Sequence, residues 1–277
     1  MNRSLANAVS ALRRSGPTLL CVHAVQTAWA LLLLAPVREE LSASVLPYFT
    51  EPSLTMADAA RVLEAIVRRG PELLRWAPAL LVVFALLAPA LTVGWVHALG
   101  SAAGPVRALQ RGVLCAPRAL AVRLACLLGF CGAGAATLML LALLLRVATP
   151  QLESMVRTLA VLLLAGSALA FATLHDLGLA ALATRGCSAV SALRASVTLL
   201  QPRWLLARAA SACAALCLVA LADLCGRIAW PLHGLAAPLG PALATALGQV
   251  LLLASTASRG LWLALAVAAS DLSLRRP

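Results

Sequence analysis

Residues 174–208 read LHDLGLAALATRGCSAVSALRASVTLLQPRWLLAR, and they contain the kinds of segment from which the whole chain is built. The stretch begins inside an apolar run, which His175 and Asp176 interrupt. It continues as a mixed polar and apolar segment, 188–201, and returns to apolar sequence at Pro202. Proline is well tolerated at the first position of a helix, because the N–H it lacks would have no intrahelical acceptor there. The stretch therefore predicts the end of one membrane helix, a surface helix, and the start of the next membrane helix.

The composition of the chain requires a membrane. Of its 277 residues, 62% are hydrophobic and 12% are charged, whereas soluble domains average about 45–50% apolar and about 25% charged residues. No soluble core could hide this excess, so the bilayer must solvate much of the chain. We predict one all-α domain over 1–277, a polytopic membrane protein with six transmembrane helices arranged as three hairpins. The predicted spans are 17–36, 77–99, 120–145, 156–182, 205–225 and 243–268.

Three amphipathic segments are expected to lie on the cytoplasmic membrane surface: 1–16, 107–115 and the connector 183–204. Pro17 and Pro117 follow the first two segments, and Pro202 follows 188–201, the amphipathic part of the connector. We expect each of these prolines to begin a spanning helix. The pattern predicts an internal repeat of three units, each a surface helix followed by a transmembrane hairpin.

The remaining connections have characters of their own. The longest polar loop, 37–76, is predicted to be extracytoplasmic and to contain a surface helix. The segment 226–241 is too apolar for a free loop and too rich in proline for a helix, so we expect an interfacial or re-entrant segment. Trp95 is expected at the membrane interface, which indole rings favour. Gly129, Gly132 and Gly134 are small residues of the kind that lets helix backbones approach closely in lipid; they lie in the third span.

The charge pattern indicates orientation. The net charge of +12 comes from 22 arginines without lysine, against 10 acids. With both termini on one side, that side holds 14 of the arginines and two of the acids. Loops with excess Arg face the cytoplasm, so both termini are predicted to be cytoplasmic. The arginines lie in short loops between apolar runs, which indicates a lipid bilayer and no nucleic acid as partner. Arg, Ala and Leu use GC-rich codons, which favours a GC-rich bacterial genome. The membrane is then expected to be the bacterial inner membrane.

Two stretches of the sequence resemble a known group of proteins. ALRRSGPTLL at 11–20, and HDLGLAAL with SALRASVTLLQPRWLLARA within 175–209, are similar to loosely defined, uncharacterised bacterial membrane proteins with six helices. Those proteins resemble the membrane domain attached to some glycerophosphodiester phosphodiesterases. The resemblance implies the topology. It implies no catalytic residues, and the phosphodiesterase domain itself is missing from this sequence.

His175 and Asp176 are the candidate substrate-binding residues. An ionisable group within the bilayer costs roughly 2.5–3.5 kcal/mol on insertion scales, so it requires an explanation. Asp176 could accept a proton or bind a cation, or it could form a structural ion pair with Arg123 or Arg208. Successive helical residues point about 100° apart, so His175 and Asp176 are not expected to face one site squarely.

Ser191, Arg194 and Thr198 are the candidate partner-docking residues. They share one face of the 188–201 segment, and Val190 and Val197 belong to the opposite, apolar face. The chain has none of the motifs H-E-x-x-H, G-x-S-x-G or G-x-x-x-x-G-K-[ST], and its eight cysteines form no C-x-x-C pair. We therefore expect no enzyme, no metal and no cofactor.

Three functions remain open on these grounds. A non-enzymatic scaffold or accessory subunit of a membrane complex fits the uniformly apolar spans best. The alternative is a transporter permease, for example the membrane subunit of an ATP-driven exporter, with 188–201 docking the ATPase. A lipid-modifying enzyme that depends on Asp176 is the weakest of the three.

Overall fold

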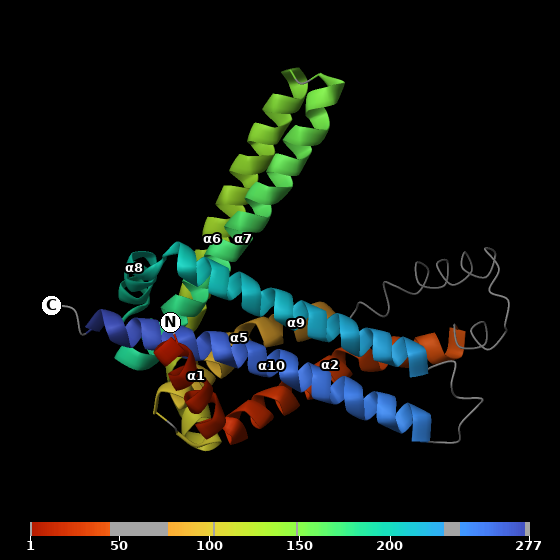
Figure 1. Cartoon of the computed structure of the whole chain (residues 1–277), viewed down its shortest axis with the longest axis vertical. Helices are drawn as coiled ribbons and strands as arrows, with labels where there is room; N and C mark the ends of the chain where they lie inside the picture. The colour runs from red at the N-terminus through yellow and green to blue at the C-terminus, as the bar shows by residue number, and fades with distance from the viewer. Residues whose placement is uncertain (1, 45–76, 102, 148, 230–238, 275–277) are drawn as a thin grey trace. The chain divides into compact units, whose positions relative to one another are not determined.

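The computed structural model describes residues 2–44, 77–101, 103–147, 149–229 and 239–274 (Figure 1). The described residues are almost wholly α-helical and contain no strand, which confirms the predicted all-α class. In chain order the helices are α1 (Asn2–Arg14), α2 (Gly16–Ser44), α5 (Ala77–Ser101), α6 (Pro105–Val147), α7 (Pro150–Arg185), α8 (Ala189–Leu199), α9 (Pro202–Ala229) and α10 (Leu239–Leu274).

Five helices in the described part of the chain are long and apolar enough to cross a membrane: α5, α6, α7, α9 and α10. The protein is therefore a multi-pass helical membrane protein. The remaining predicted span, 17–36, is the first in chain order and falls in α2, which is not one of these five apolar helices. That helix also continues past the predicted boundary at Pro36 to Ser44. Residues 37–44 of the predicted polar loop are thus helical, and 45–76, with the predicted surface helix, lie outside the described residues.

The chain divides into two compact units. One comprises Cys21–Ala88, and the other comprises Met1–Leu20 together with Pro89–Pro277. Within the first unit, Trp29 of α2 stacks on Phe84 of α5 with ring centroids 5.8 Å apart. The second unit, called here the main unit, contains all the candidate site residues.

The core of the main unit lies where the arginine-rich connectors meet the helices. Most of its fully buried side chains come from the end of α5, the first half of α6, and the last halves of α7 and α10, and two come from α8. Examples are Val96, Val122, Leu182 and Trp262. Trp95 is also buried, with its ring against Gly260 of α10, so the indole packs against protein.

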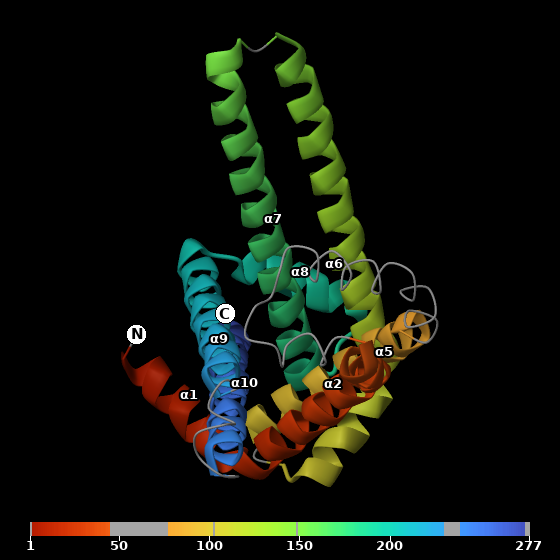
Figure 2. The same ribbon diagram turned by 90° about the vertical axis from the view of Figure 1, so that its right-hand side faces the viewer.

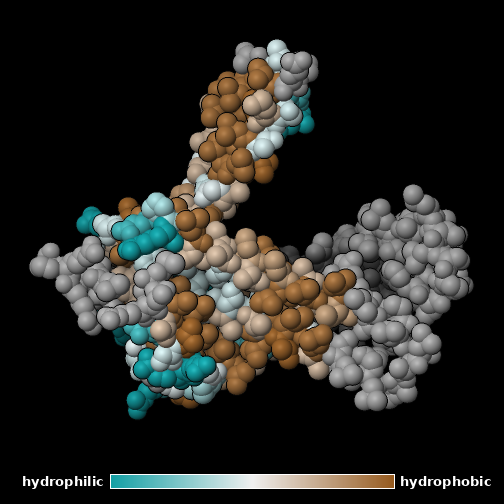
Figure 3. All heavy atoms as spheres, viewed as in Figure 1, coloured by the Kyte–Doolittle hydropathy of each residue, from teal (hydrophilic) through white to brown (hydrophobic). Residues whose placement is uncertain are grey.

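The distal parts of α6 and α7 form a hairpin (Figure 2), and many of its apolar side chains are exposed. Met139, Leu143, Met155 and Leu162 are all more than half exposed. Hydrophobic residues cover the face of this hairpin that Figure 3 shows, and hydrophilic residues gather near α1 and α8. An apolar surface of this extent requires lipid or another apolar partner.

Two of the three prolines lie at the start of a helix as predicted, and of these two helices α9 is one of the five candidate spans. Pro17 is the second residue of α2, and Pro202 is the first residue of α9. The prediction for Pro117 is wrong, because α6 runs without interruption from Pro105 to Val147 with Pro117 inside it. Membrane helices tolerate internal proline because neighbouring groups satisfy the freed backbone carbonyl. The segment 107–115 is therefore the first part of α6 rather than a separate surface helix.

Residues 226–241 are partly helical, contrary to the prediction. Helix α9 extends to Ala229 and α10 begins at Leu239. Residues 230–238, the centre of the predicted re-entrant segment, lie outside the described residues.

Glycines set three close helix contacts in the main unit. A Cβ on Gly94 would collide with the carbonyl of Ala108, and one on Gly112 would collide with the carbonyl of Ala90, so α5 and α6 cross backbone against backbone. Gly129 packs on the ring of Phe171 of α7, as a close-contact glycine should. The other predicted small-residue contacts are weaker. A Cβ on Gly132 would meet no atom within 4 Å, and one on Gly134 would make only ordinary contact with α7.

Candidate functional site

Asp176 lies in the core of the main unit, about two turns before the end of α7. Its exposed fraction is 2%, and Thr173, Leu177 and Leu179 around it on the same helix are wholly buried. Cys126 of α6 lies near its carboxylate. A buried carboxylate is costly unless charge and hydrogen bonds compensate for its lost hydration, so its neighbours decide its role.

Both oxygens of Asp176 are engaged, by side chains from three helices. Trp262 of α10 donates its indole N–H to Oδ2 at 2.8 Å. Arg208 of α9 places Nε 3.1 Å from the same Oδ2. This contact of Arg208 is an ion pair and not a hydrogen bond, because Nε has no hydrogen-bond partner. His175 of α7 places Nδ1 3.2 Å from Oδ1. We call Asp176, His175, Arg208 and Trp262 the carboxylate cluster.

A second arginine and a second indole surround the carboxylate cluster. Arg259 lies one turn before Trp262 on α10, within range of an electrostatic interaction with Asp176. Trp204 of α9 meets Trp262 edge-on at 6.5 Å between ring centroids, and the guanidinium of Arg203 stacks over Trp204 at 5.1 Å. The carboxylate thus faces two arginines, which gives this buried site a positive balance of charge.

The structure places Asp176 in an ion pair, one of the arrangements expected for it. Its partner is Arg208, one of the two predicted arginines. His175 reaches the carboxylate through Nδ1 even though it is the adjacent residue. Its Nε2 atom is buried and has no hydrogen-bond partner. The arrangement joins α7, α9 and α10 chemically and can hold these helices in one register.

The sequence reasoning missed Trp262 and Arg259. A signal for them existed, since Arg259 and Trp262 are three residues apart in an apolar span and therefore share a helix face. An arginine at that depth requires an acidic partner, and Asp176 is one of few acids in the predicted spans. Matching the two would have predicted the contact between α7 and α10.

The predicted helix between the fourth and fifth spans is present as α8. Helix α7 ends at Arg185 with Gly186 in the left-handed conformation, at φ 62°, which closes the helix with little steric cost. Ser188 then caps α8, its side chain accepting a hydrogen bond from the N–H of Ser191 at 3.3 Å. Capping by serine satisfies an otherwise unpaired N–H.

Helix α8 packs on α7 through its small residues. Ala192 and Ser196 are buried against α7, where Gly178 leaves room for them. Val190 and Val197, which belong to the predicted apolar face, are each 61% exposed. The small residues Ala192 and Ser196 allow a closer contact with α7 than valine would. Ser191, Arg194 and Thr198 are exposed as predicted, in a group separate from the carboxylate cluster.

Nothing in the described part of the chain forms a group of three or more His, Cys, Asp or Glu residues able to hold a metal ion. Comparison with known proteins adds no assignment, since no family model, curated protein or solved structure matches the chain.

Proposed function

We propose that the chain is a non-enzymatic integral protein of the bacterial inner membrane that acts as a scaffold or accessory subunit of a membrane complex. The observation that carries this proposal is the engagement of Asp176. Its oxygens contact Arg208, Trp262 and His175 from three helices. A carboxylate that is 2% exposed and already contacted from three helices is suited to fixing those helices together.

The proposed topology has six spans as three hairpins, with both termini in the cytoplasm. The pairs α6–α7 and α9–α10 pack together, and the contact of Trp29 with Phe84 joins α2 to α5 as the remaining pair. Arg185 at the end of α7 donates to the carbonyl of Ser270 near the end of α10 at 2.9 Å, which supports a common side for these ends. The resemblance to six-helix bacterial membrane proteins supports the same topology.

The proposed partner surface is the exposed face of α8. Arg194 carries its positive charge there, between Ser191 and Thr198, and all three side chains are exposed. Such a surface would suit an acidic cytoplasmic face of a partner protein, because complementary charge steers association.

The test is purification of the protein from native membranes in mild detergent, with mass spectrometry of the proteins that accompany it. A stoichiometric membrane partner supports the scaffold proposal, and its loss with Arg194→Glu but not with Arg157→Glu would assign the contact to α8. Arg157 is a suitable control because it is exposed and lies at the opposite end of α7. Saturable transport by liposomes that contain the protein alone would overturn the proposal.

One observation favours the alternative, a transporter permease. Helix α8 is a short helix between two spans, and it contacts α6, α7 and α10. A partner that moved α8 would therefore act on several spans together. An ATPase as the stoichiometric companion, with ATP-dependent transport that Arg194→Glu abolishes, would replace the scaffold proposal with this one.

A further inference from the structure

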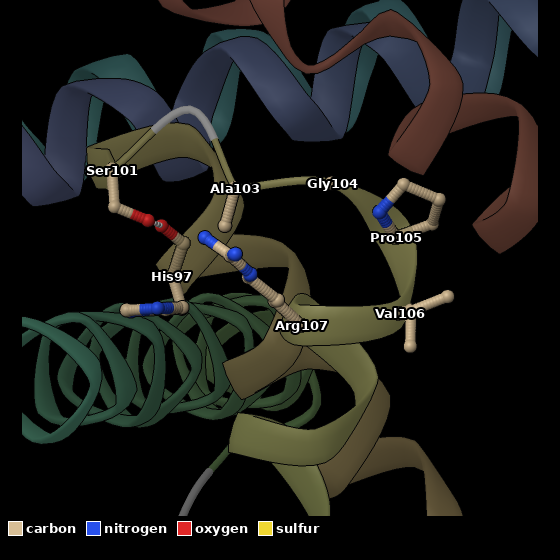
Figure 4. A pocket seen from close by; sticks show the side chains of 7 residues that line it. All are labelled: His97, Ser101, Ala103, Gly104, Pro105, Val106 and Arg107. Carbon is tan, nitrogen blue, oxygen red and sulfur yellow. Dashed lines mark hydrogen bonds between the residues drawn. The ribbon is translucent and has the colours of Figure 1, made fainter.

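A pocket of about 530 Å³ lies at the corner where α5 ends and α6 begins (Figure 4). His97 and Ser101 contribute to it from α5, and Gly104, Pro105 and Arg107 contribute from the turn and the start of α6. The pocket is separate from the carboxylate cluster. Its walls are held in place by the backbone contacts at Gly94 and Gly112, one to two turns away on the same two helices.

The pocket is positively charged. The side chain of Arg107 points back from α6 towards His97 and Ser101 (Figure 4). Arg111, one turn later, lies near His97, with its guanidinium beside Gly186. The Arg111 Nε atom is buried without a hydrogen-bond partner. The described residues that line the pocket include no acid, and none occurs in the sequence between Glu72 and Glu153. The described lining therefore carries positive charge with no acid beside it in the sequence to compensate.

The backbone at the pocket also favours an anion. The first intrahelical hydrogen bond of α6 is the one that Ala108 donates to the carbonyl of Gly104 at 3.0 Å. The amides of Val106 and Arg107 precede it at the positive end of a 43-residue helix. N–H groups at a helix start, combined with arginine side chains, are the usual protein ligands of a phosphate group.

An apolar stripe leads away from the pocket along α6. Val106, Leu109 and Val113 follow the spacing of one helix face and are 69%, 52% and 61% exposed. The stripe runs from the helix start towards the predicted span at 120–145. A soluble phosphate would have no use for it, whereas the acyl chain of a lipid would cover it.

We propose that this pocket binds the phosphate group of an anionic phospholipid. Arg107 and the first amides of α6 hold the phosphate, the charge of Arg111 near His97 adds to the positive field, and one acyl chain lies along Val106, Leu109 and Val113. A free phosphate or phosphate ester has the same recognised group, so the experiment must separate the two sources. The site gives the protein a preference for anionic lipid at the arginine-rich end of its helices.

The experiment measures lipid retained by the full-length protein, by native mass spectrometry after reconstitution with equal amounts of phosphatidylglycerol and phosphatidylcholine. We expect one phosphatidylglycerol to be retained in preference. Arg107→Gln should reduce this retention roughly tenfold, the loss expected for one charge-assisted hydrogen bond. Arg157→Gln removes the same charge from an exposed site on α7, and it should leave retention unchanged. Equal losses in both variants, or no preference in the native protein, would overturn the proposal.

Two further measurements separate lipid from soluble phosphate. Val113→Ser should weaken lipid retention, because it removes apolar contact with the acyl chain and leaves the arginines in place. Glycerol 3-phosphate in excess should not displace the lipid. Displacement by glycerol 3-phosphate, together with full retention in Val113→Ser, would show that the site takes a soluble ester and that the lipid proposal is wrong. Arg107 and Val113 are exposed, so both variants should fold, and a thermal unfolding curve checks this.

Discussion

At the scale of single residues, Asp176 and Arg208 should depend on each other for stability. Asp176→Asn keeps the shape of the side chain and an acceptor for Trp262, but it leaves Arg208 near no carboxylate in the cluster. Removing one partner of a buried ion pair costs about 3–5 kcal/mol. Because Arg208 is 19% exposed, we expect a loss near the lower limit, about 3 kcal/mol. The free energy of unfolding in detergent micelles, titrated with SDS, measures it.

The matched control lies on the same helix. Glu153 and Arg157 form an exposed ion pair on α7, and exposed pairs are worth about 0–1 kcal/mol. Glu153→Gln should therefore change the free energy of unfolding by less than about 1 kcal/mol.

In the double variant Asp176→Asn with Arg208→Gln, part of the lost stability should return. If the two single losses simply add, the ion pair is not what makes Asp176 necessary.

Trp262 should contribute through its indole N–H. Trp262→Phe keeps an aromatic ring against Trp204 but removes the donor to Asp176 Oδ2. A lost hydrogen bond to a charged group costs about 1.5–3 kcal/mol. Trp204→Phe is the control, because it keeps an aromatic ring against Trp262 and changes no described hydrogen bond to Asp176. It should lower the free energy of unfolding by less than Trp262→Phe does. Equal losses from the two variants in the same SDS titration would contradict this role for the indole N–H.

Residue identity predicted part of the carboxylate cluster and missed part. Asp176 stood out because charge is costly among Leu and Ala, and Arg208 was one of two foreseen partners. Trp262 and Arg259 were not foreseen, since the neighbours of a helix depend on how it rotates and packs. Trp95 shows the same effect. An indole near a span end fits the interface, yet a glycine on another helix, Gly260, provided a buried site for it.

At the scale of elements, the crossing of α5 and α6 should be the most sensitive contact between helices. Gly112→Leu places a side chain where the carbonyl of Ala90 lies, so the backbones must separate. Overpacking costs typically about 1–3 kcal/mol where side chains can move, and here the obstacle is backbone. We expect a loss of at least about 3 kcal/mol in the free energy of unfolding.

Gly132→Leu is the control for this prediction, because it makes the same change on the same helix where a Cβ would meet nothing within 4 Å. It should leave the free energy of unfolding nearly unchanged. Any gain should be roughly 1 kcal/mol at most, because leucine has a higher helix propensity than glycine. Both variants are measured by SDS titration and by elution in size-exclusion chromatography. Similar behaviour of the two would show that α5 and α6 do not cross at Gly112.

The helices themselves were largely predictable, because long apolar runs in a membrane protein leave the backbone few alternatives to helix. Their ends were less so. Proline marked the starts of α2 and α9, but Pro117 lies inside α6, which already begins at Pro105, because the residues before Pro117 continue the helix pattern. Helix α6, with 43 residues, is about 64 Å long at about 1.5 Å per residue, roughly twice the hydrocarbon thickness. A span and its extension beyond the membrane can be one helix, and hydropathy alone does not separate them.

At the scale of the whole molecule, charge and hydropathy predicted a helical multi-pass protein, and the described helices agree. Which apolar side chains are buried between helices was not predictable, because apolar side chains that face lipid and those that face protein look the same in sequence. Leu182 and Leu162 illustrate this on one helix: the first is fully buried and the second is 63% exposed. Packing between helices depends on small residues and polar contacts rather than on hydrophobicity.

The proposed topology makes a prediction about the turn between α6 and α7. Thr149 caps the start of α7 at this turn and is exposed, and Arg194 is exposed on α8. These positions lie at opposite ends of α7, so a helix that spans the bilayer puts them on opposite sides.

In intact cells, a maleimide that cannot cross the membrane should label Thr149→Cys and leave Arg194→Cys unlabelled, while inside-out vesicles should give the reverse. The unsubstituted chain, with its eight cysteines, sets the background. Labelling of both positions from one side would show that α7 does not cross the membrane, and the reverse pattern in cells would invert the orientation that the arginines predict.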